Sequence, residues 1–192
     1  MSDQPTPAEV LLFWFGGPLG QGKRHKHWFE KDAALDGAIR ERFLAVYEKA
    51  AAGELAHWKE RPAECLALIV VLDQFPRNMF RGTARAFAAD PLALDAARHA
   101  AAQGFDRRLS PVERLFVYLP FEHSESLEDQ LTACALIEPL EAFEETEDAY
   151  RYAVAHRDII QRFGRFPHRN AALGRASTAA EIEFLEQPGS GF

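Results

Sequence analysis

A run of apolar residues near the middle of the chain constrains the fold more than any other feature of the sequence. Every residue from Cys65 to Leu72 is apolar, and Pro62 just before the run is well placed to open a helix. A helix that is apolar on all sides belongs at the middle of a domain, where other elements cover it. The run is far shorter than the roughly 20 residues of a membrane span. We therefore predict a buried central helix over 62–74.

The remainder of the sequence carries helix signals and no clear alternating strand pattern. Thr6, Ser110 and Thr178 each precede a glutamate by three residues, which is the pattern of a helix-capping box. With the central helix, these signals predict an all-α fold of about eight helices in one compact domain over residues 1–192. The expected helices cover about 6–15, 32–52, 62–74, 90–103, 110–120, 126–143 and 149–163, with a short last helix from 178.

Composition and charge limit the possible partners. The hydrophobic fraction of 47% is typical of a soluble globular protein, and the net charge of -7 argues against general nucleic-acid binding. The first residues lack the basic flank and apolar core of a signal peptide, so we expect a cytoplasmic protein that does not enter a membrane. Cys65 and Cys134 lie in apolar helical settings and read as buried free thiols. The sequence carries no signal for an oligomeric state.

Three segments of similar make-up follow apolar helical stretches and contain a proline. They are Phe75-Pro76-Arg77-Asn78, Leu119-Pro120-Phe121-Glu122-His123 and Phe166-Pro167-His168-Arg169-Asn170. Because proline disfavours helical geometry in the residue before it, we expect each proline to end the preceding helix. Each segment then presents arginine, histidine, asparagine or glutamate. We predict that the three segments meet in one polar pocket.

Four residues are candidates for catalysis. Asp73 continues an apolar stripe of the central helix, so its carboxylate needs a partner: either an arginine that pins the chain turn, or a ligand. His156 lies on the apolar stripe of its helix. It is either a core residue whose hydrogen bonds are made within the protein, or a residue that carries a proton in catalysis. Glu122 and His123 are adjacent between two helices, where they serve either acid–base chemistry or helix capping and arginine pairing.

Arginines are concentrated towards the end of the chain. Six of them lie between Arg151 and Arg175, with Asp158 as the one acid. A coding bias could explain the number of arginines in the chain, whereas it does not explain their clustering. Guanidinium groups bind carboxylates and phosphates through paired hydrogen bonds. We therefore predict a site for a small anionic ligand or an acidic peptide, with these binding residues: Arg77, Asn78, Arg81, Arg165, His168, Arg169 and Asn170.

The sequence predicts no metal and no cofactor. It contains no His-Glu-x-x-His motif, no cysteine pair at zinc spacing, and no glycine pattern of a nucleotide-binding loop. His25-Lys26-His27 is a weak His-x-His signal in an expected loop. A metal site assembled in three dimensions from His123, His156, His168 and Glu122 is the alternative.

Long segments of the chain resemble a bacterial family called domain of unknown function 924. The resemblance includes 72–82, 119–125, 156–170 and the tail around 184–192, and it covers essentially the whole chain. It implies an all-helical fold of the tetratricopeptide-like type, a right-handed superhelix. The family has no established activity, so the resemblance implies no catalytic residues.

Three functions remain open on the sequence. The first is binding of the small anion or acidic peptide by the arginines. The second is a hydrolase or other acid–base enzyme, with Glu122 or Asp73 as the base, His123 or His156 as proton carrier, and arginines stabilising charge. The third is a scaffold that offers a helical groove to a protein partner, which rests on analogy of fold alone.

Overall fold

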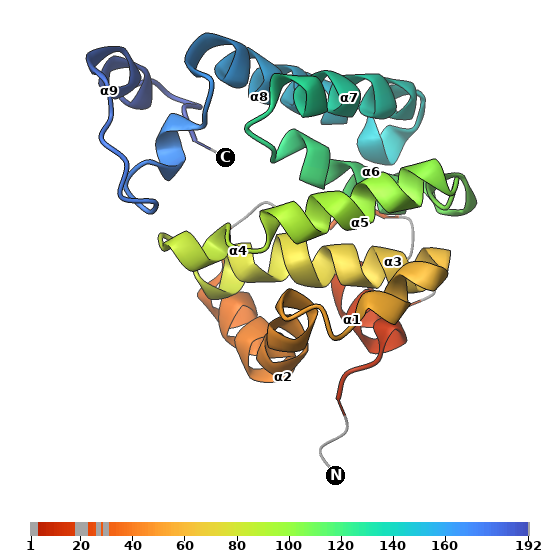
Figure 1. Ribbon diagram of the computed structural model, residues 1–192. Helices are drawn as coiled ribbons and strands as arrows, with labels where there is room; N and C mark the ends of the chain where they lie inside the picture. Colours follow the sequence, from red (N-terminus) through yellow and green to blue (C-terminus); the bar gives the residue numbers. More distant parts are fainter. Residues whose placement is uncertain (1–3, 18–22, 26–27, 29–30, 192) are drawn as a thin grey trace.

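The apolar run forms a buried helix in the middle of a stack of helices (Figure 1). The computed structural model describes residues 4–17, 23–25, 28 and 31–191. These residues form helices, turns and connecting segments and include no strand, so the predicted all-α class is confirmed. Every helix in the described part of the chain is too short or too polar to span a lipid bilayer.

The helices appear in the predicted order. The α-helices are α1 (Pro7–Phe15), α2 (Ala33–Ala51), α3 (Pro62–Ile69), α4 (Phe75–Met79), α5 (Asp90–Ala102), α6 (Pro111–Glu122), α7 (Leu127–Ile137), α8 (Ala149–Phe163) and α9 (Ala179–Leu185). A π-helical turn, Val70–Gln74, joins α3 to α4. Short 3₁₀ turns are η2 (Ala56–Glu60), η4 (Ala84–Ala86), η5 (Asp106–Arg108), η6 (Glu138–Ala142), η7 (Glu144–Thr146) and η8 (Pro167–Arg169).

Local sequence explains where most helices begin. The three predicted capping boxes form at Thr6, Ser110 and Thr178, and each side chain accepts a hydrogen bond from the backbone N–H three residues on. In α8 the end is also as predicted, because Gly164 adopts the left-handed conformation (φ 71°) that ends a helix readily. These signals act within a few residues, so they remain readable without the tertiary fold.

Two of the three prolines do not end their helices, and that prediction is wrong. The helical path continues through Pro76 to Met79, because the π turn before it widens the helix and Phe75 N–H donates to Val70 O. Pro120 lies inside α6, which continues to Glu122, and the N–H of His123 donates to Leu119 O. In the third segment, Gly164 has already ended α8 before Pro167 opens η8.

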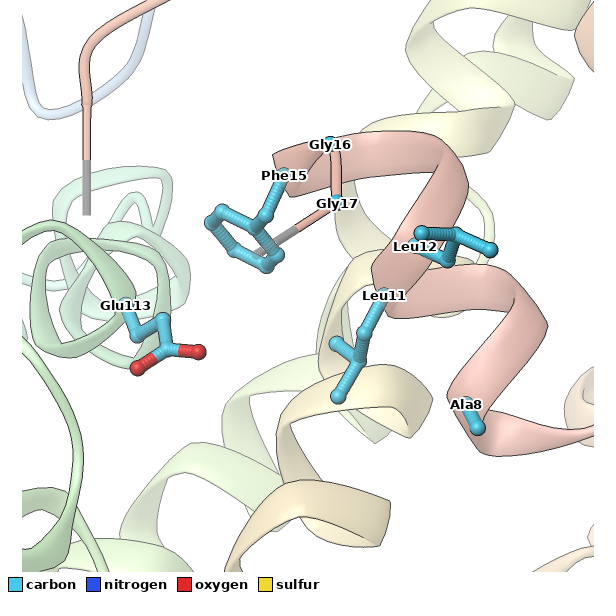
Figure 2. A pocket seen from close by; sticks show the side chains of 7 residues that line it. All are labelled: Ala8, Leu11, Leu12, Phe15, Gly16, Gly17 and Glu113. Atoms are coloured by element: carbon cyan, nitrogen blue, oxygen red, sulfur yellow. The ribbon is translucent and has the colours of Figure 1, made fainter. Parts of the chain in front are cut away.

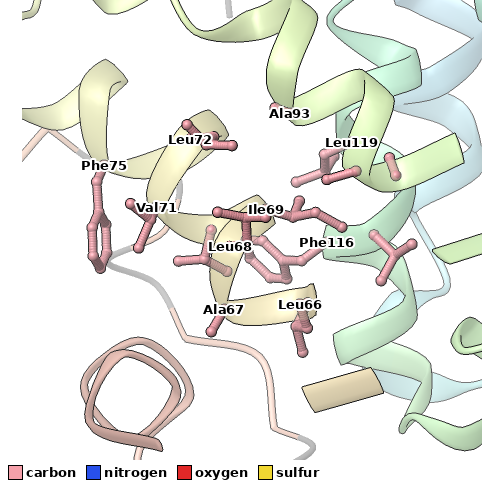
Figure 3. Close-up of a cluster of buried hydrophobic side chains, with 14 of the residues drawn as sticks. Leu66, Ala67, Leu68, Ile69, Val71, Leu72, Phe75, Ala93, Phe116 and Leu119 are labelled. Atoms are coloured by element: carbon pink, nitrogen blue, oxygen red, sulfur yellow. The ribbon is translucent and has the colours of Figure 1, made fainter. Parts of the chain in front are cut away.

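The core is built around α3 (Figure 3). This helix packs against α1, α5 and α6, and Ile69, Val70 and Val71 have no exposed surface. Figure 3 shows Phe116 and Leu119 of α6 and Ala93 of α5 beside it. Burying apolar surface at about 25 cal/mol per Å² is the main force that holds such a helix in place. The continuous helical path from α3 through the π turn to α4, which we call the central rod, thereby fixes the position of its polar end, which contains Asp73 and Arg77.

Candidate functional site

Polar side chains from six segments meet at one end of the central rod. The π turn, α4, the start of α5, the end of α6 and the middle of α8 each contribute, and η8 approaches from the end of the chain. We call this group the polar cluster, and it consists of Asp73, Arg77, Asp90, Glu122, His123, His156, His168 and Arg169. Contacts, shared partners and electrostatic interactions connect all of its members. Seven of the eight are residues that the sequence placed in a single pocket.

Asp73 is the most buried member of the cluster, with no exposed surface. Its Oδ1 lies 2.8 Å from His123 Nδ1 and 3.3 Å from Arg77 Nη1, and Gln74 Nε2 donates to Oδ2 at 2.6 Å. Burial by itself disfavours the carboxylate. The Arg77 guanidinium and the His123 ring outweigh it and hold the pKa of Asp73 well below its usual range. Asp73 is therefore ionised at neutral pH.

His123 is held with one ring nitrogen on Asp73. Burial and the neighbouring Arg77 lower the pKa of His123, in spite of the Asp73 carboxylate, so the ring is neutral at pH 7. A carboxylate only accepts hydrogen bonds, so the proton of the neutral ring sits on Nδ1 and Nε2 carries a lone pair. Among the described residues Nε2 has no hydrogen-bond partner, and the side chain is 15% exposed. His123 thus offers a proton acceptor at the edge of the cluster.

Glu122 and His156 form a second carboxylate–histidine pair beside the first. His156 Nδ1 lies 3.0 Å from Glu122 Oε1 and 2.9 Å from the carbonyl oxygen of Tyr152. Both side chains are buried, and the centres of the His123 and His156 rings are 6.3 Å apart. The predicted inward orientation of His156 is confirmed, and its ring lies next to a carboxylate.

Two arginines share the carboxylate of Asp90. Arg77 donates to both oxygens, at 2.8 and 3.0 Å, and Arg169 Nη1 donates to Oδ2 at 3.3 Å. Burial, and then repulsion from Arg77, lower the pKa of Arg169 to about 10. Burial and the neighbouring Arg169 lower the pKa of His168 to about 3, so His168 is neutral at pH 7. Arg169 therefore shares its one hydrogen-bonded carboxylate with Arg77.

The other predicted binding residues lie outside the cluster, where they form internal contacts. Asn78 and Arg81 both donate to Asp36 of α2, at 2.8 Å for the amide and at 2.5 and 2.9 Å for the guanidinium. Arg165 donates to both oxygens of Glu181, at 2.6 and 2.8 Å. On the remaining segment, Asn170 Nδ2 donates to Ser177 Oγ and Asn170 Oδ1 accepts from Arg175. The structure therefore does not bring Asn78, Arg81, Arg165 and Asn170 to the two histidine–carboxylate pairs.

Sequence reasoning overlooked Asp90 and gave Glu125 a different role. Asp90 precedes a proline at the start of α5, which is the pattern of a helix start and shows nothing of its arginine partners. Glu125 lies just before α7, where an acid is typical of a helix start, and it binds Arg175 through two hydrogen bonds of 2.7 and 2.9 Å. It also accepts the N–H of Phe166 at 2.8 Å. No local signal identifies partners that lie 41 to 50 residues away in the sequence.

Two hollows on the described surface lie away from the cluster. One, of about 170 Å³, is lined by Leu11, Leu12 and Phe15 of α1 with Glu113 of α6 (Figure 2). The other lies beside Arg165 and Glu181. The described residues include no group of three or more His, Cys, Asp or Glu side chains placed to hold a metal ion. Lys26 and His27 of the His-x-His signal lie outside the described residues.

Comparisons with known proteins agree with the fold. The model of a family described as bacterial protein of unknown function (DUF924) matches residues 10–189. The solved structure of a protein of unknown function, ATU0120 from Agrobacterium tumefaciens, is 43% identical in sequence. It superimposes with a TM-score of 0.84 over 95% of this chain and 97% of that one. None of the curated proteins matches the chain.

Proposed function

The chain belongs to the DUF924 family of bacterial proteins of unknown function, and we propose that this member is a hydrolytic acid–base enzyme whose proton acceptor is His123. The observation that carries the proposal is the 2.8 Å contact between Asp73 Oδ1 and His123 Nδ1, with His123 Nε2 left without a partner among the described residues. A carboxylate that orients a histidine in this way is a recurrent arrangement for general-base catalysis. The sequence favoured Glu122 or Asp73 as the base, whereas the geometry supports His123.

Each group in the first pair has a separate task. The Asp73 carboxylate holds the proton on Nδ1, so Nε2 faces the substrate as a lone pair. When Nε2 takes a proton from water or a substrate hydroxyl, the resulting imidazolium lies against the carboxylate, which stabilises it. Arg77 keeps Asp73 ionised and disfavours a charged His123 ring in the resting state. Asp73 is a positioning residue in this scheme.

The second pair supplies another site for a proton. Glu122 and His156 are separated by 3.0 Å, and the 6.3 Å between the two ring centres rules out a direct hydrogen bond between the histidines. A substrate or a water molecule that bridges the rings would accept a proton from one and lose a proton to the other. This arrangement suits hydrolysis, in which a nucleophile loses a proton and a leaving group gains one.

A panel of chromogenic esters, amides, lactones, thioesters and phosphate esters tests the proposal. We expect the wild-type protein to hydrolyse one of these classes and His123→Gln to lose at least about 100-fold in rate, the usual contribution of a general base. His57→Gln is the matched control, because His57 is exposed on η2. Activity that survives in His123→Gln would refute the assignment.

A second candidate is a protein that binds a small anion without catalysis. The observation that favours it is the buried Nε of Arg169, which has no hydrogen-bond acceptor among the described residues. Absence of turnover across the panel, together with anion binding, would select this candidate. The scaffold interpretation has weaker support, since the exposed large apolar side chains of the described residues are dispersed over several elements: Leu12, Leu92, Leu127, Leu131, Phe143, Tyr152 and Ile182.

A further inference from the structure

The edge of Arg169 that would bind a carboxylate has no partner in the part of the chain that the structure describes. The residue is 6% exposed, and its one hydrogen bond runs from Nη1 to Asp90 at 3.3 Å. Among the described residues Nε has neither exposed surface nor an acceptor. Nη2 likewise makes no hydrogen bond with the described residues, and it keeps some surface exposed to solvent. Buried polar groups usually have a partner, so an unused guanidinium edge suggests a missing one.

Two other arginines of the same chain show what this edge binds. Arg81 uses Nε and Nη2 to hold both oxygens of Asp36, at 2.5 and 2.9 Å. Arg165 uses the same two nitrogens on Glu181, at 2.6 and 2.8 Å. These two parallel N–H groups match the two oxygens of a carboxylate. In Arg169 the Nε and Nη2 edge has the same geometry and no carboxylate.

Two aromatic rings and one shared carboxylate surround the guanidinium of Arg169 among the described residues. Its guanidinium stacks on Phe87 and Phe166, with distances of 4.7 and 4.4 Å to the ring centres. The carboxylate it contacts, Asp90, is already bound at both oxygens by Arg77. The adjacent His168 is neutral at pH 7. A carboxylate placed at the Nε and Nη2 edge would supply the partner that this edge lacks among the described residues.

We propose that the substrate carries a carboxylate group that binds side-on to Nε and Nη2 of Arg169, within reach of the two histidine–carboxylate pairs. This inference rests on the proposed function, because it treats the polar cluster as the place where the substrate binds. Nε is enclosed, so binding requires a shift of η8. That turn is only three residues long and lies between Gly164 and Gly174, whose backbones are left-handed (φ 71° and 65°).

Titrations followed by NMR test this assignment without any activity assay. Protein labelled at the histidine rings and at arginine Nε is titrated with succinate, and separately with inorganic phosphate, at constant ionic strength. We expect saturable shifts of the His168 ring and the Arg169 Nε–H signal with succinate, and weaker binding of phosphate. Arg169→Lys should weaken succinate binding at least tenfold, because lysine keeps the charge and loses the paired donors. Arg107→Gln, an exposed arginine on η5, is the control and should bind as the wild type does.

Asp90→Asn provides a test in the opposite direction. It removes the competing carboxylate, so succinate should bind several-fold more tightly, a gain that misfolding cannot produce. The inference is wrong if wild-type signals do not saturate, if Arg169→Lys binds equally well, if Asp90→Asn brings no gain, or if phosphate binds more tightly than succinate. Loss of this binding with hydrolysis intact refutes the inference alone. If succinate binds as expected and His123→Gln still hydrolyses its substrate, the proposed function is refuted and the inference about Arg169 is not.

Discussion

At the scale of single residues, Asp73 shows how one set of contacts can serve both structure and chemistry. A buried carboxylate is costly unless donors surround it, and Gln74, Arg77 and His123 supply them. The Arg77 contact is the structural pairing that the sequence suggested as one alternative. The His123 contact is the one that catalysis would use. Both roles follow from placing a carboxylate at the polar end of an apolar helix.

Replacing Asp73 by asparagine tests its effect on His123. The carboxylate raises the pKa of His123 against burial and Arg77, so Asp73→Asn should lower that pKa further, as measured by NMR titration of the ring. Because Arg77 keeps its two hydrogen bonds to Asp90 and loses the charged contact with Asp73, we also expect a loss of about 1–3 kcal/mol in unfolding free energy in urea. Asp158→Asn is the exposed control. An unchanged His123 pKa in folded Asp73→Asn would contradict the proposed positioning role.

At the scale of elements, the π turn that contains Asp73 decides which way the side chains after it face. Its hydrogen bond from Phe75 N–H to Val70 O spans five residues, one more than the four-residue step of an α-helix, so it rotates every later side chain around the helix axis. Such turns are frequent at functional sites. The same turn lets the helical path pass Pro76, which is why the proline signal misled the prediction of a helix end.

The segment from Gly164 to Ser177, which carries His168 and Arg169, is attached to the α6–α7 connection by one ion pair. Arg175 donates to both oxygens of Glu125, and the same carboxylate accepts the N–H of Phe166. Burial is outweighed by these hydrogen bonds, which lower the pKa of Glu125. Charge-assisted, paired contacts of this kind contribute about 1–3 kcal/mol.

Breaking that ion pair should loosen the segment before the rest of the protein. We expect Arg175→Gln to speed amide hydrogen exchange over 164–177 by about tenfold or more and to leave exchange in α3 unchanged, as measured by mass spectrometry. Arg107→Gln provides the comparison. Uniform acceleration along the whole chain would mean that the pair stabilises the global fold and does not hold this segment specifically.

At the scale of the whole molecule, helices pack mainly on others that are near in sequence. The contacts run from α1 to α3, then through α5, α6 and α7 to α8, as in the stack in Figure 1. A large core spans these helices, and a second cluster of Ile159, Ile160 and Phe166 anchors the C-terminal segment. From this continuity we expect residues 1–192 to behave as a single domain, with one unfolding transition.

The half-buried neutral histidines His168 and His123 should make that transition sensitive to acid. His168 keeps a pKa of about 3 in the fold, while an unfolded histidine takes up a proton near pH 6.5. Below about pH 6.5 the unfolded state therefore binds more protons, and its free energy falls relative to the folded state by up to about 1.4 kcal/mol per pH unit for each such histidine. Burial and Arg77 lower the pKa of His123 in the same direction.

Urea unfolding between pH 7 and pH 4.5 measures this dependence. We expect stability to fall as the pH decreases, and His168→Gln to show a shallower slope because one proton fewer is taken up on unfolding. His57→Gln, which alters an exposed histidine, should keep the wild-type slope. Equal slopes in His168→Gln and the wild type would show that His168 is not held neutral by the fold.

The sequence by itself determined the helices, the buried central rod and the inward orientation of Asp73 and His156. Capping boxes, glycine ends and apolar stripes depend on neighbours within about one or two helical turns, so they can be read along the chain. It also named seven of the eight members of the polar cluster as site candidates, since polar residues that follow buried stripes emerge at helix ends.

Only the tertiary structure decided which of these groups are partners. Asp73 meets His123 across 50 residues, and Arg169 reaches Asp90 across 79. Arg81 and Arg165 instead bind carboxylates elsewhere, although their local sequence makes them look equivalent to Arg77 and Arg169. The physical reason is that a guanidinium or imidazole binds whatever the packing of helices brings within about 3 Å, and that packing is set by the apolar faces of the helices.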